Sequence, residues 1–559
     1  MRLILLPVFL FFYSQVLAQS FHAVNVRSLG ASGNKEELAT RFIQQALDQV
    51  ADEGGGTVYF PAGDYTSGSI VLHSNTTLYL EAGATLFASK DAADYPFQTT
   101  AKRPTLIFAD SAHHIAIRGK GRIHGQAERT YEPLKKVDHF IKDITANAEK
   151  AGVDMKMYYK VPPFVRLITL ENCTDITLED FSLIESPSWG ITVKWSNRVS
   201  IRALYIYSSQ EAGVNSDGID IDGSSNVHIS DCTVTTGDDA IVLKSSQGVL
   251  PDGTIRHESC ENVTVSNCIL SSTSTALKIG TESVGDFRHI IFNNCIIRNS
   301  NRGLSIVARY GGTIEDVIFS NITIETDRKH FNWWGNGDPI WVVVILRNQR
   351  YGLSKVRNIL FENIIAHGQG TSKIEGYAPD SANPEGSLIE NIQFRNVQFF
   401  MEAEDYPDKR ADDALMIHQV DGLKLTDVRI HWDEKETEPK WRHGVHLRDV
   451  NKLDIDGLTG RQGLLEDSIA FLRLHNVSHA NVQDITPTEG THTMVEVSGK
   501  HTQNLHVQNH DRLKRAKRSF YHHPEVPTQI QKRLTNYDEW GFDEKMPEEE
   551  GRKKNKQKE

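Results

Sequence analysis

The sequence has few of the features that mark several classes of protein. Among its 559 residues, no run beyond the N-terminal segment is long and apolar enough to span a bilayer, and the formal net charge is −12 without a long basic run. We therefore expect neither a membrane nor a nucleic acid as the main partner. Cysteine is scarce and odd in number, at spacings that match no zinc site. We interpret the five cysteines as small buried residues, with a Cys260–Cys268 bridge as the alternative.

The two ends of the chain differ from its middle. Arg2 precedes a short apolar run, Leu3–Phe12, and small residues lead to a cleavage point before Gln19. This pattern is typical of an export signal, so we expect residues 1–18 to be removed and the protein to be secreted or periplasmic. Residues 511–559 form a charged tail, which we expect to be largely disordered from about residue 543.

Short alternating strands recur along the middle of the chain, each followed by a polar pair and another short strand. The copies start 23 to 42 residues apart, at Asp175, Arg198, Asn226, Asn262, His289, Asp316, Asn358, Asn391 and Gly422. This period, without helices between the strands, predicts an all-β fold: a right-handed parallel β-helix over residues 19–510. Stacked coils of such a solenoid share one long core.

The predicted solenoid also has signals for a cap and for corners. Asn34 as N-cap, Glu37 three residues later and Gly54–Gly56 as a stop predict an amphipathic helix that seals one end. Asn and Asp recur between the strands, where they fit stacked turns. The Asn-x-Ser/Thr sequences are either such corners or glycosylation sites: Asn75, Asn172, Asn262, Asn321 and Asn476.

A second strand motif occurs once per coil, and its copies align residues into a column. Copies begin at Trp189, Asp217, Asp239, Thr275 and Arg302, and one at Asp338 continues the series. Since parallel strands stack about 4.8 Å apart, Asp217, Asp238 and Asp239 should gather on two adjacent coils. Trp189 lies on one side of them along the column, and Lys278 and Arg302 lie on the other.

Carboxylates that lie this close have the properties of an acid/base pair. Repulsion raises the pKa of at least one, which keeps its proton while its neighbours ionise, as glycoside hydrolysis requires. A solvent-facing Trp189 would offer a sugar ring a flat platform. The alternative for the three aspartates is a Ca²⁺ site. We interpret Asp220 and Asp222 as solvated residues of the outer face.

With these motifs, the chain resembles the polygalacturonase-like enzymes of glycoside hydrolase family 28 from Val24 to the 480s. The resemblance rests on "GRIHGQ", on "NSDGIDI" and on "GDDAIVLKS", in order on a β-helix repeat. It implies that Asp238 is the general acid and that Asp217 and Asp239 activate water, with inversion and without a metal or other cofactor. Acid and base should then lie roughly 6.5–9.5 Å apart.

The chain departs from the family where galacturonate is held. The family's Gly-His-Gly aligns with Ser274–Ala276 and its Arg-Ile-Lys with Ser305–Val307, so these basic residues are missing. Lys278 lies one coil before the missing Arg, in the same slot. It is either a relocated anchor for the galacturonate or a solvated lysine, and Lys244 is a weaker candidate for such an anchor. We expect poor action on plain polygalacturonate. The residues expected to bind a polysaccharide or oligosaccharide substrate are Asn215, Trp189, Lys278, Arg302 and Arg309.

Three long segments are expected to shape the cleft and to favour attack at chain ends: Ala127–Phe164, Ser245–Ser259 and Asp327–Trp341. Two other functions remain open for a monomeric β-helix of this kind. One is a Ca²⁺-dependent polysaccharide lyase with Lys278 or Arg309 as base. The other is a carbohydrate-binding β-helix without activity, because fold alone does not fix function.

Overall fold

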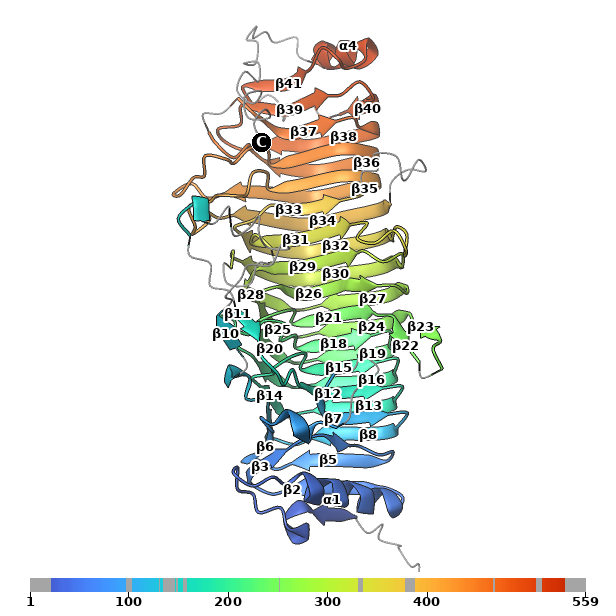
Figure 1. Ribbon diagram of the computed structural model, residues 1–559. Helices are drawn as coiled ribbons and strands as arrows, with labels where there is room; N and C mark the ends of the chain where they lie inside the picture. Colours follow the sequence, from blue (N-terminus) through green and yellow to red (C-terminus); the bar gives the residue numbers. More distant parts are fainter. Residues whose placement is uncertain are drawn as a thin grey trace, which may run out of the picture.

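The computed structural model is a long solenoid of stacked coils (Figure 1). It describes residues 22–96, 103–129, 131–133, 146, 149–153, 158–250, 252–329, 335–377, 388–465, 468–508 and 515–537. In this part of the chain, 37 strands join into one sheet that winds around the core, and the pairings between successive coils are parallel. The predicted parallel β-helix is confirmed.

The sheet has three faces, A, B and C, which each coil visits in turn. Face A consists of β4 (Ile70–Val71), β7 (Thr105–Asp110), β12 (Arg166–Glu171), β15 (Ile191–Lys194), β18 (Ile219–Asp222), β21 (Ile241–Ser245), β26 (Thr275–Ser283), β29 (Arg302–Ala308), β31 (Asp338–Val344), β33 (Ser372–Glu375), β37 (Ala470–His475), β39 (Thr493–Ser498) and β41 (Arg518–His522). Face B consists of β1 (Ala23–Asn25), β2 (Gly56–Phe60), β5 (Thr76–Leu80), β8 (His113–Arg118), β13 (Thr174–Glu179), β16 (Asn197–Arg202), β19 (Ser225–Ser230), β24 (Cys260–Ser266), β27 (Phe287–Asn293), β38 (Ser478–Pro487) and β40 (Gln503–Val507).

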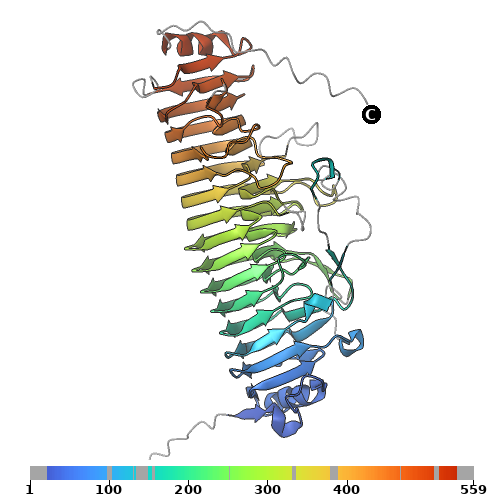
Figure 2. The ribbon, with the colours of Figure 1, turned by 90° about the vertical axis from the view of Figure 1, so that its left-hand side faces the viewer.

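Face C and the long strands complete the solenoid. Face C consists of β3 (Gly63–Ser67), β6 (Ala84–Ala88), β9 (Arg122–His124), β14 (Ser182–Ile184), β17 (Tyr205–Tyr207), β20 (Thr233–Thr236), β25 (Ile269–Ser272) and β28 (Ile296–Ser300). In later coils, longer strands each run through more than one face: β30 (Thr313–Thr326), β32 (Lys355–Gly368), β34 (Ile389–Met401), β35 (Leu415–Trp432) and β36 (Val445–Gly460). Figure 2 shows how regularly the coils stack.

Among the described residues, two short antiparallel hairpins and three 3₁₀ turns lie outside the three faces. One hairpin pairs β10 (Tyr131–Pro133) with β11 (Tyr158–Lys160), and the other pairs β22 (Gly248–Val249) with β23 (Ile255–Arg256). The 3₁₀ turns are η1 (Val26–Leu29), η2 (Ala92–Asp94) and η3 (Ala127–Arg129).

The core is a set of side-chain stacks, one member per coil. The rings of Phe292, Phe319, Phe361 and Phe394 follow one another at centroid distances of 4.9, 5.2 and 4.8 Å. These distances match the spacing of adjacent strands, so each ring packs on the same ring of the next coil. The column of the second strand motif is confirmed as well, because the predicted partners are paired in register: Ile191, Ile219, Ile241, Leu277, Leu304 and Ile340.

The corners are built from asparagine and aspartate in the left-handed backbone region, which these residues tolerate better than most. The asparagines of all five Asn-x-Ser/Thr sequences have positive φ, between 53° and 62°. Their side chains also bond between coils: Asn391 Nδ2 donates to Asn358 Oδ1 at 2.9 Å, and Asn262 Nδ2 to Asn226 Oδ1 at 3.1 Å. The corner interpretation is confirmed for these positions.

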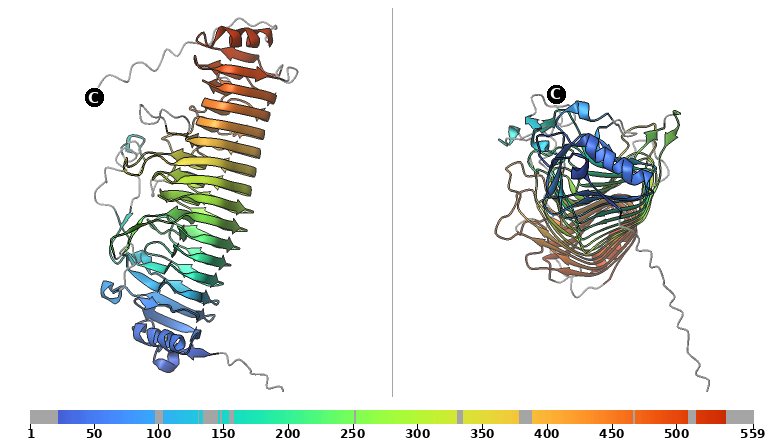
Figure 3. Two further views of the ribbon diagram at one scale, coloured as in Figure 1. Left: turned by 90° about the vertical axis from the view of Figure 1, so that its right-hand side faces the viewer. Right: turned by 90° about the horizontal axis from the view of Figure 1, so that it is seen from below.

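The first coil is covered by helix α1 (Thr40–Asp52), which lies lengthwise across the end of the solenoid in the right-hand view of Figure 3. The predicted helix start was wrong, because Ala39 is the N-cap. Asn34 and Glu37 do meet, with Nδ2 and Oε1 3.3 Å apart, but they close a turn before the helix. The stop at Gly54–Gly56 is confirmed by φ angles of 91° to 152°.

The other end of the β-helix extends beyond residue 510, where the sequence placed its boundary. Strand β41 pairs in parallel with β39, and helix α4 (Thr528–Tyr537) follows it. The predicted export signal, and the tail from about residue 543, lie outside the described residues. Within the described part, no helix is both long and apolar enough to cross a membrane.

All five cysteines are buried and unpaired, so the Cys260–Cys268 bridge is not formed. Their interpretation as packing residues is confirmed.

Candidate active site

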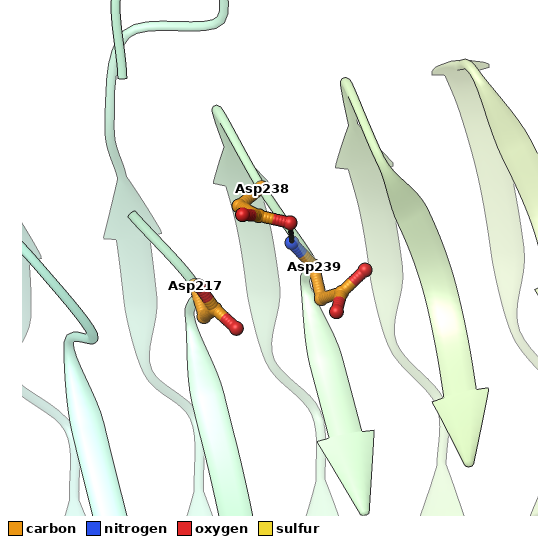
Figure 4. A group of neighbouring side chains, drawn as sticks. All are labelled: Asp217, Asp238 and Asp239. Carbon is orange, nitrogen blue, oxygen red and sulfur yellow. Dashed lines mark hydrogen bonds between the residues drawn. The ribbon is translucent and has the colours of Figure 1, made fainter. Parts of the chain in front are cut away.

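Three carboxylates meet on face A where two neighbouring strands begin (Figure 4). Asp217 precedes β18, and Asp238 and Asp239 precede β21. One oxygen from each lies within 4.8 Å of the others, and the side chains are almost fully buried. The structure thus brings together the residues predicted to carry the chemistry.

Glycines explain why the two coils approach so closely here. A Cβ on Gly218 would lie 2.5 Å from the Ala240 carbonyl oxygen, and one on Gly237 would lie 2.3 Å from that of Gly213. A larger residue would push the coils apart at these points. Hydroxyls of Thr236 and Ser272 also donate to the Asp238 carbonyl, each at 2.6 Å, and hold that corner in place.

Two lysines neutralise two of the three carboxylates. Lys244 Nζ lies 3.1 Å from Asp217 Oδ2 and 2.9 Å from Asp220 Oδ1. Lys278 Nζ lies 2.6 Å from Asp239 Oδ2, whose Oδ1 accepts from the Ser274 hydroxyl at 2.8 Å.

Asp238 is different, since it forms no ion pair with the described residues. Its oxygens accept from Asn215 Nδ2 at 3.3 Å and from the Asp239 backbone N–H at 2.9 Å.

The electrostatics separate the roles of the three groups. Burial, followed by the charges of Asp217 and Asp239, raises the pKa of Asp238 to about 8, so it is protonated at neutral pH. Burial also raises the pKa of Asp217, and the charge of Lys244 opposes that rise. Burial by itself would lower the pKa of Lys244, but Asp217 and Asp220 hold it well above its ordinary value. The site therefore has a buried acid beside carboxylates that contact ammonium groups.

The predicted binding residues are found in different situations. Trp189 is only half-buried, but it is not an open platform: the guanidinium of Arg166 and the Nζ of Lys244 lie 4.0 and 3.5 Å from its ring centroid. Arg302 pairs with Asp338, with Nε and Oδ2 3.2 Å apart, and its guanidinium lies over the Trp341 ring. These two predicted contacts are already engaged within the protein.

Arg309 and Asn215 differ from Trp189 and Arg302. The Nε atom of Arg309 is buried without a hydrogen-bond partner among the described residues. Asn215 is exposed, with a φ of 55°, and its amide contacts the acid.

One interpretation from the sequence was wrong, and one of the two alternatives for Lys278 is excluded. Asp220 and Asp222 are not solvated, because their exposed fractions are 0% and 2%. The chain after β21 covers these strand ends, and the backbone N–H of Ser246 donates to Asp222 Oδ1 at 2.6 Å. Lys278 is not a solvated lysine, because its side chain is 13% exposed and contacts Asp239. The lysine that the sequence placed weakly, Lys244, contacts two buried carboxylates.

A cavity of about 460 Å³ has Arg166, Trp189, Lys194, Asp222 and Glu282 in its lining, which includes none of the three carboxylates. Trp189 and Glu282 both lie against Lys244, the partner of Asp217, and so connect the cavity to the site. The wall of the cavity comes from loops that follow the strands. Tyr351 donates from its hydroxyl to Gln247 Oε1 at 3.0 Å, and its ring meets the edge of Tyr310 at 5.3 Å. The segment Ser245–Ser259 therefore shapes the site as predicted. Half of the Ala127–Phe164 insertion lies outside the described residues, as do Trp333 and Trp334 of the Asp327–Trp341 segment.

The cluster does not fit a resident Ca²⁺ ion. Ca²⁺ takes six to eight oxygen ligands, whereas ammonium groups already occupy one oxygen each of Asp217 and Asp239. A divalent cation among these oxygens would also lie next to two positive charges.

Comparison with known proteins identifies the family. Residues 53–329 match the model of glycosyl hydrolases family 28. The chain belongs to glycoside hydrolase family 28. The matched segment begins at Glu53, the C-cap residue of α1, and extends past the end of β30. It includes the coils that carry Asp217, Asp238 and Asp239. The family resemblance inferred from the motifs is confirmed.

Individual relatives are distant. A probable polygalacturonase of Vitis vinifera is 28% identical over 249 residues, covering 42% of this chain and 46% of the relative. An exo-poly-α-D-galacturonosidase of Dickeya chrysanthemi is 27% identical over 259 residues, covering 40% and 42%. The chain thus matches about half the length of these curated relatives. The family 28 exopolygalacturonase of Yersinia enterocolitica has a similar fold, with a TM-score of 0.58, 22% identity and 78% of each chain covered.

Proposed function

We propose that this family 28 member is a glycoside hydrolase that cleaves a pectin-like acidic polysaccharide. The observation that carries the proposal is a buried carboxylic acid, Asp238, whose pKa of about 8 keeps it protonated between two carboxylates. The names of the relatives, a probable polygalacturonase and an exo-poly-α-D-galacturonosidase, support the substrate class.

In the proposed reaction, Asp238 donates its proton to the glycosidic oxygen as the bond to the leaving sugar breaks. Asp217 and Asp239 accept a proton from the attacking water, which adds to the anomeric carbon. Lys244 contacts Asp217 and Lys278 contacts Asp239, and an ammonium partner favours the ionised form of a carboxylate. The reaction ends with Asp238 ionised, and one proton returns to it from the base through solvent.

The spacing of the carboxylates favours a second mechanism. Their nearest oxygens lie within 4.8 Å, closer than the 6.5–9.5 Å expected for an inverting pair. A short separation is typical of retaining enzymes, in which one carboxylate attacks the sugar and forms a covalent glycosyl-enzyme. NMR of the first product distinguishes the two: an inverted anomer supports activated water, and a retained anomer supports a nucleophilic Asp217 or Asp239.

We propose further that the enzyme works from chain ends and acts poorly on plain polygalacturonate. Small buried residues, Thr275, Ser305 and Val307, replace the basic groups that hold galacturonate in the family. The Gln247–Tyr351–Tyr310 wall stands beside the site, and the Dickeya relative is named as an exo-acting enzyme.

The test is digestion of homogalacturonan, rhamnogalacturonan and uronic-acid oligomers, with Asp238→Asn as the inactive reference. Release of reducing sugar with little early fall in viscosity is expected, whereas a rapid fall in viscosity contradicts end-wise action. A lyase would instead lose activity with EDTA and form unsaturated, ultraviolet-absorbing products. Absence of hydrolysis on all of these substrates contradicts the proposed function.

A further inference from the structure

Arg166 occupies a place in the active-site column that the sequence analysis missed. It is the first residue of β12, and the register of β12, β15 and β18 places it in the slot of Trp189 and Asp217, two coils before the latter. The side chain lines the cavity and is 7% exposed. An arginine therefore lines a cavity on face A, in the same slot as Asp217 and two coils before it.

Within the described part of the chain, the guanidinium of Arg166 has no acidic partner. Its Nε is buried without a hydrogen bond, and among the described residues the side chain forms no ion pair. Its contact is the Trp189 ring, 4.0 Å from the guanidinium carbon. Asp220 and Asp222 influence it only through space, and Arg103 adds a further positive charge nearby.

The other charged groups that line the cavity are balanced. Lys194 Nζ lies 4.0 Å from Asp222 Oδ2, and Glu282 Oε2 lies 3.8 Å from Lys244 Nζ. A buried guanidinium that lacks a counter-charge loses hydration without a full replacement, and stacking on an aromatic ring returns only part of the loss. Among the charged groups that line the cavity, Arg166 is therefore the one to which an incoming anion would supply the missing counter-charge.

The planar fork of an arginine suits one anion in particular. Two parallel N–H groups match the two oxygens of a carboxylate, which gives short, charge-assisted hydrogen bonds. Two other cations of the column are already paired, Lys278 with Asp239 and Arg302 with Asp338. Arg309 also has a buried Nε without a hydrogen bond, but it is not among the residues that line this cavity. A substrate carboxylate in this site would thus find its strongest unused partner at Arg166.

We propose that Arg166 binds the carboxylate of a uronosyl residue of the substrate in this cavity. This inference rests on the proposed function and specifies its substrate class: the sugar next to the scissile bond on the Arg166 side of the column is acidic. In the family, the basic residues of the Arg-Ile-Lys motif hold the galacturonate, and this chain has no cation at that position. Arg166 binds the carboxylate instead, from the opposite side of the three aspartates along the solenoid.

Binding is measured by calorimetry in the inactive Asp238→Asn protein, with trigalacturonate and with the matched neutral galactose trimer. Adding Arg166→Gln should weaken binding of trigalacturonate about 30-fold or more, as expected when a desolvated carboxylate loses its charged anchor. Binding of the neutral trimer should change less than about threefold. Arg166→Lys, which keeps the charge but loses the fork, should fall between the two.

Arg198→Gln is the matched control, since Arg198 is an exposed arginine of the same solenoid paired with Asp175. It should bind both trimers like the parent, and thermal unfolding checks that each variant folds. If Arg166→Gln does not fold, Arg166→Lys alone decides: unchanged trigalacturonate affinity overturns the proposal. Equal losses for the acidic and neutral trimers, or no binding of trigalacturonate by the parent, also overturn it.

The binding assay separates this inference from the proposed function. If uronic-acid oligomers are hydrolysed equally well with and without Arg166, the inference fails and the proposed function stands. If binding depends on Arg166 but the protein hydrolyses none of these oligomers, the proposed function fails and the binding role of Arg166 stands.

Discussion

Two clusters of buried acidic residues on face A differ in the direction in which the pKa of their carboxylates is shifted. The first is the group of Asp217, Asp238 and Asp239, for which we propose the catalytic role. The second lies many coils later, where Asp413 Oδ2 accepts from His446 Nδ1 at 2.8 Å and Glu496 Oε1 lies 3.0 Å from His523 Nε2. Both clusters are buried, so burial alone does not distinguish them.

The direction of the pKa shifts does distinguish them. In the second cluster, burial would raise the pKa of Asp413 and of Glu496, but histidine hydrogen bonds hold both below their ordinary values. In the first cluster, burial and like charges prevail, and the pKa of Asp238 rises to about 8. The raised pKa of Asp238, which has no ion pair with the described residues, suits proton transfer, whereas the lowered pKa values of Asp413 and Glu496 suit structural pairing.

The largest expected effect comes from removing the acid. Asp238→Asn should lower kcat by about 10²–10⁴-fold or more, the usual contribution of general acid catalysis, without changing the melting temperature appreciably. The measurement is steady-state kinetics on the preferred oligomer, together with thermal unfolding. A variant that keeps more than half of the wild-type rate contradicts the assignment.

Replacing the buried cation should affect both stability and pH dependence. Lys244→Met leaves Asp217 and Asp220 without their ammonium partner, which typically costs about 3–5 kcal/mol when a buried pair is broken. The pKa of Asp217 should rise further, so the acidic limb of the kcat/KM profile should move to higher pH. Urea unfolding and a pH–rate profile test this, with Lys424→Met as an exposed-lysine control. An unmoved acidic limb would show that Asp217 is not the titrating base.

The second cluster should respond in stability alone. Asp413→Asn is expected to cost about 1–3 kcal/mol of unfolding free energy near neutral pH, because a charged hydrogen bond is lost. Since the folded-state pKa of Asp413 is lowered, this contribution is present above its ordinary value of 3.8 and is lost as the pH falls through the folded pKa. Unfolding at several pH values measures the difference. A fall in kcat comparable to that of Asp238→Asn would remove the distinction between the clusters.

The smallest expected effect concerns the alkaline limb. In the wild type, kcat/KM should fall tenfold per pH unit above about pH 8, as Asp238 loses its proton. Lys278 favours the ionised form of Asp238, so Lys278→Met should move this limb to higher pH. The shift should be less than about 1 pH unit, because Lys278 contacts Asp239 rather than Asp238. A limb that moves to lower pH contradicts the assignment of this titration to Asp238.

The sequence predicts the fold and the meeting of the three aspartates because both follow from strand period and register. A two-residue alternation repeated in every coil determines which residues stack, so Asp217 and Asp239 fall in one column before any coordinates are known.

The partners of these residues depend on side-chain reach and on loops, which the repeat does not specify. Lys244 lies at the far end of its strand and still contacts Asp217 on the previous coil. Asp222 appeared solvated because the loop that covers it belongs to no repeat. The copies of the second strand motif begin at Trp189, so the predicted column does not include Arg166, although "RLITLE" has the same alternation.

Helix α1 has a consequence for how molecules associate. A solenoid whose strands pair only with the coils before and after them ends in rows of unpaired backbone N–H and C=O groups. Such edges are templates for pairing with another chain. By packing against β1, β2, β4 and β5, α1 covers the first of these rows, while α4 packs on β40 and β41 at the other end. We expect a chain shortened by residues 22–55 to add end to end and grow into filaments.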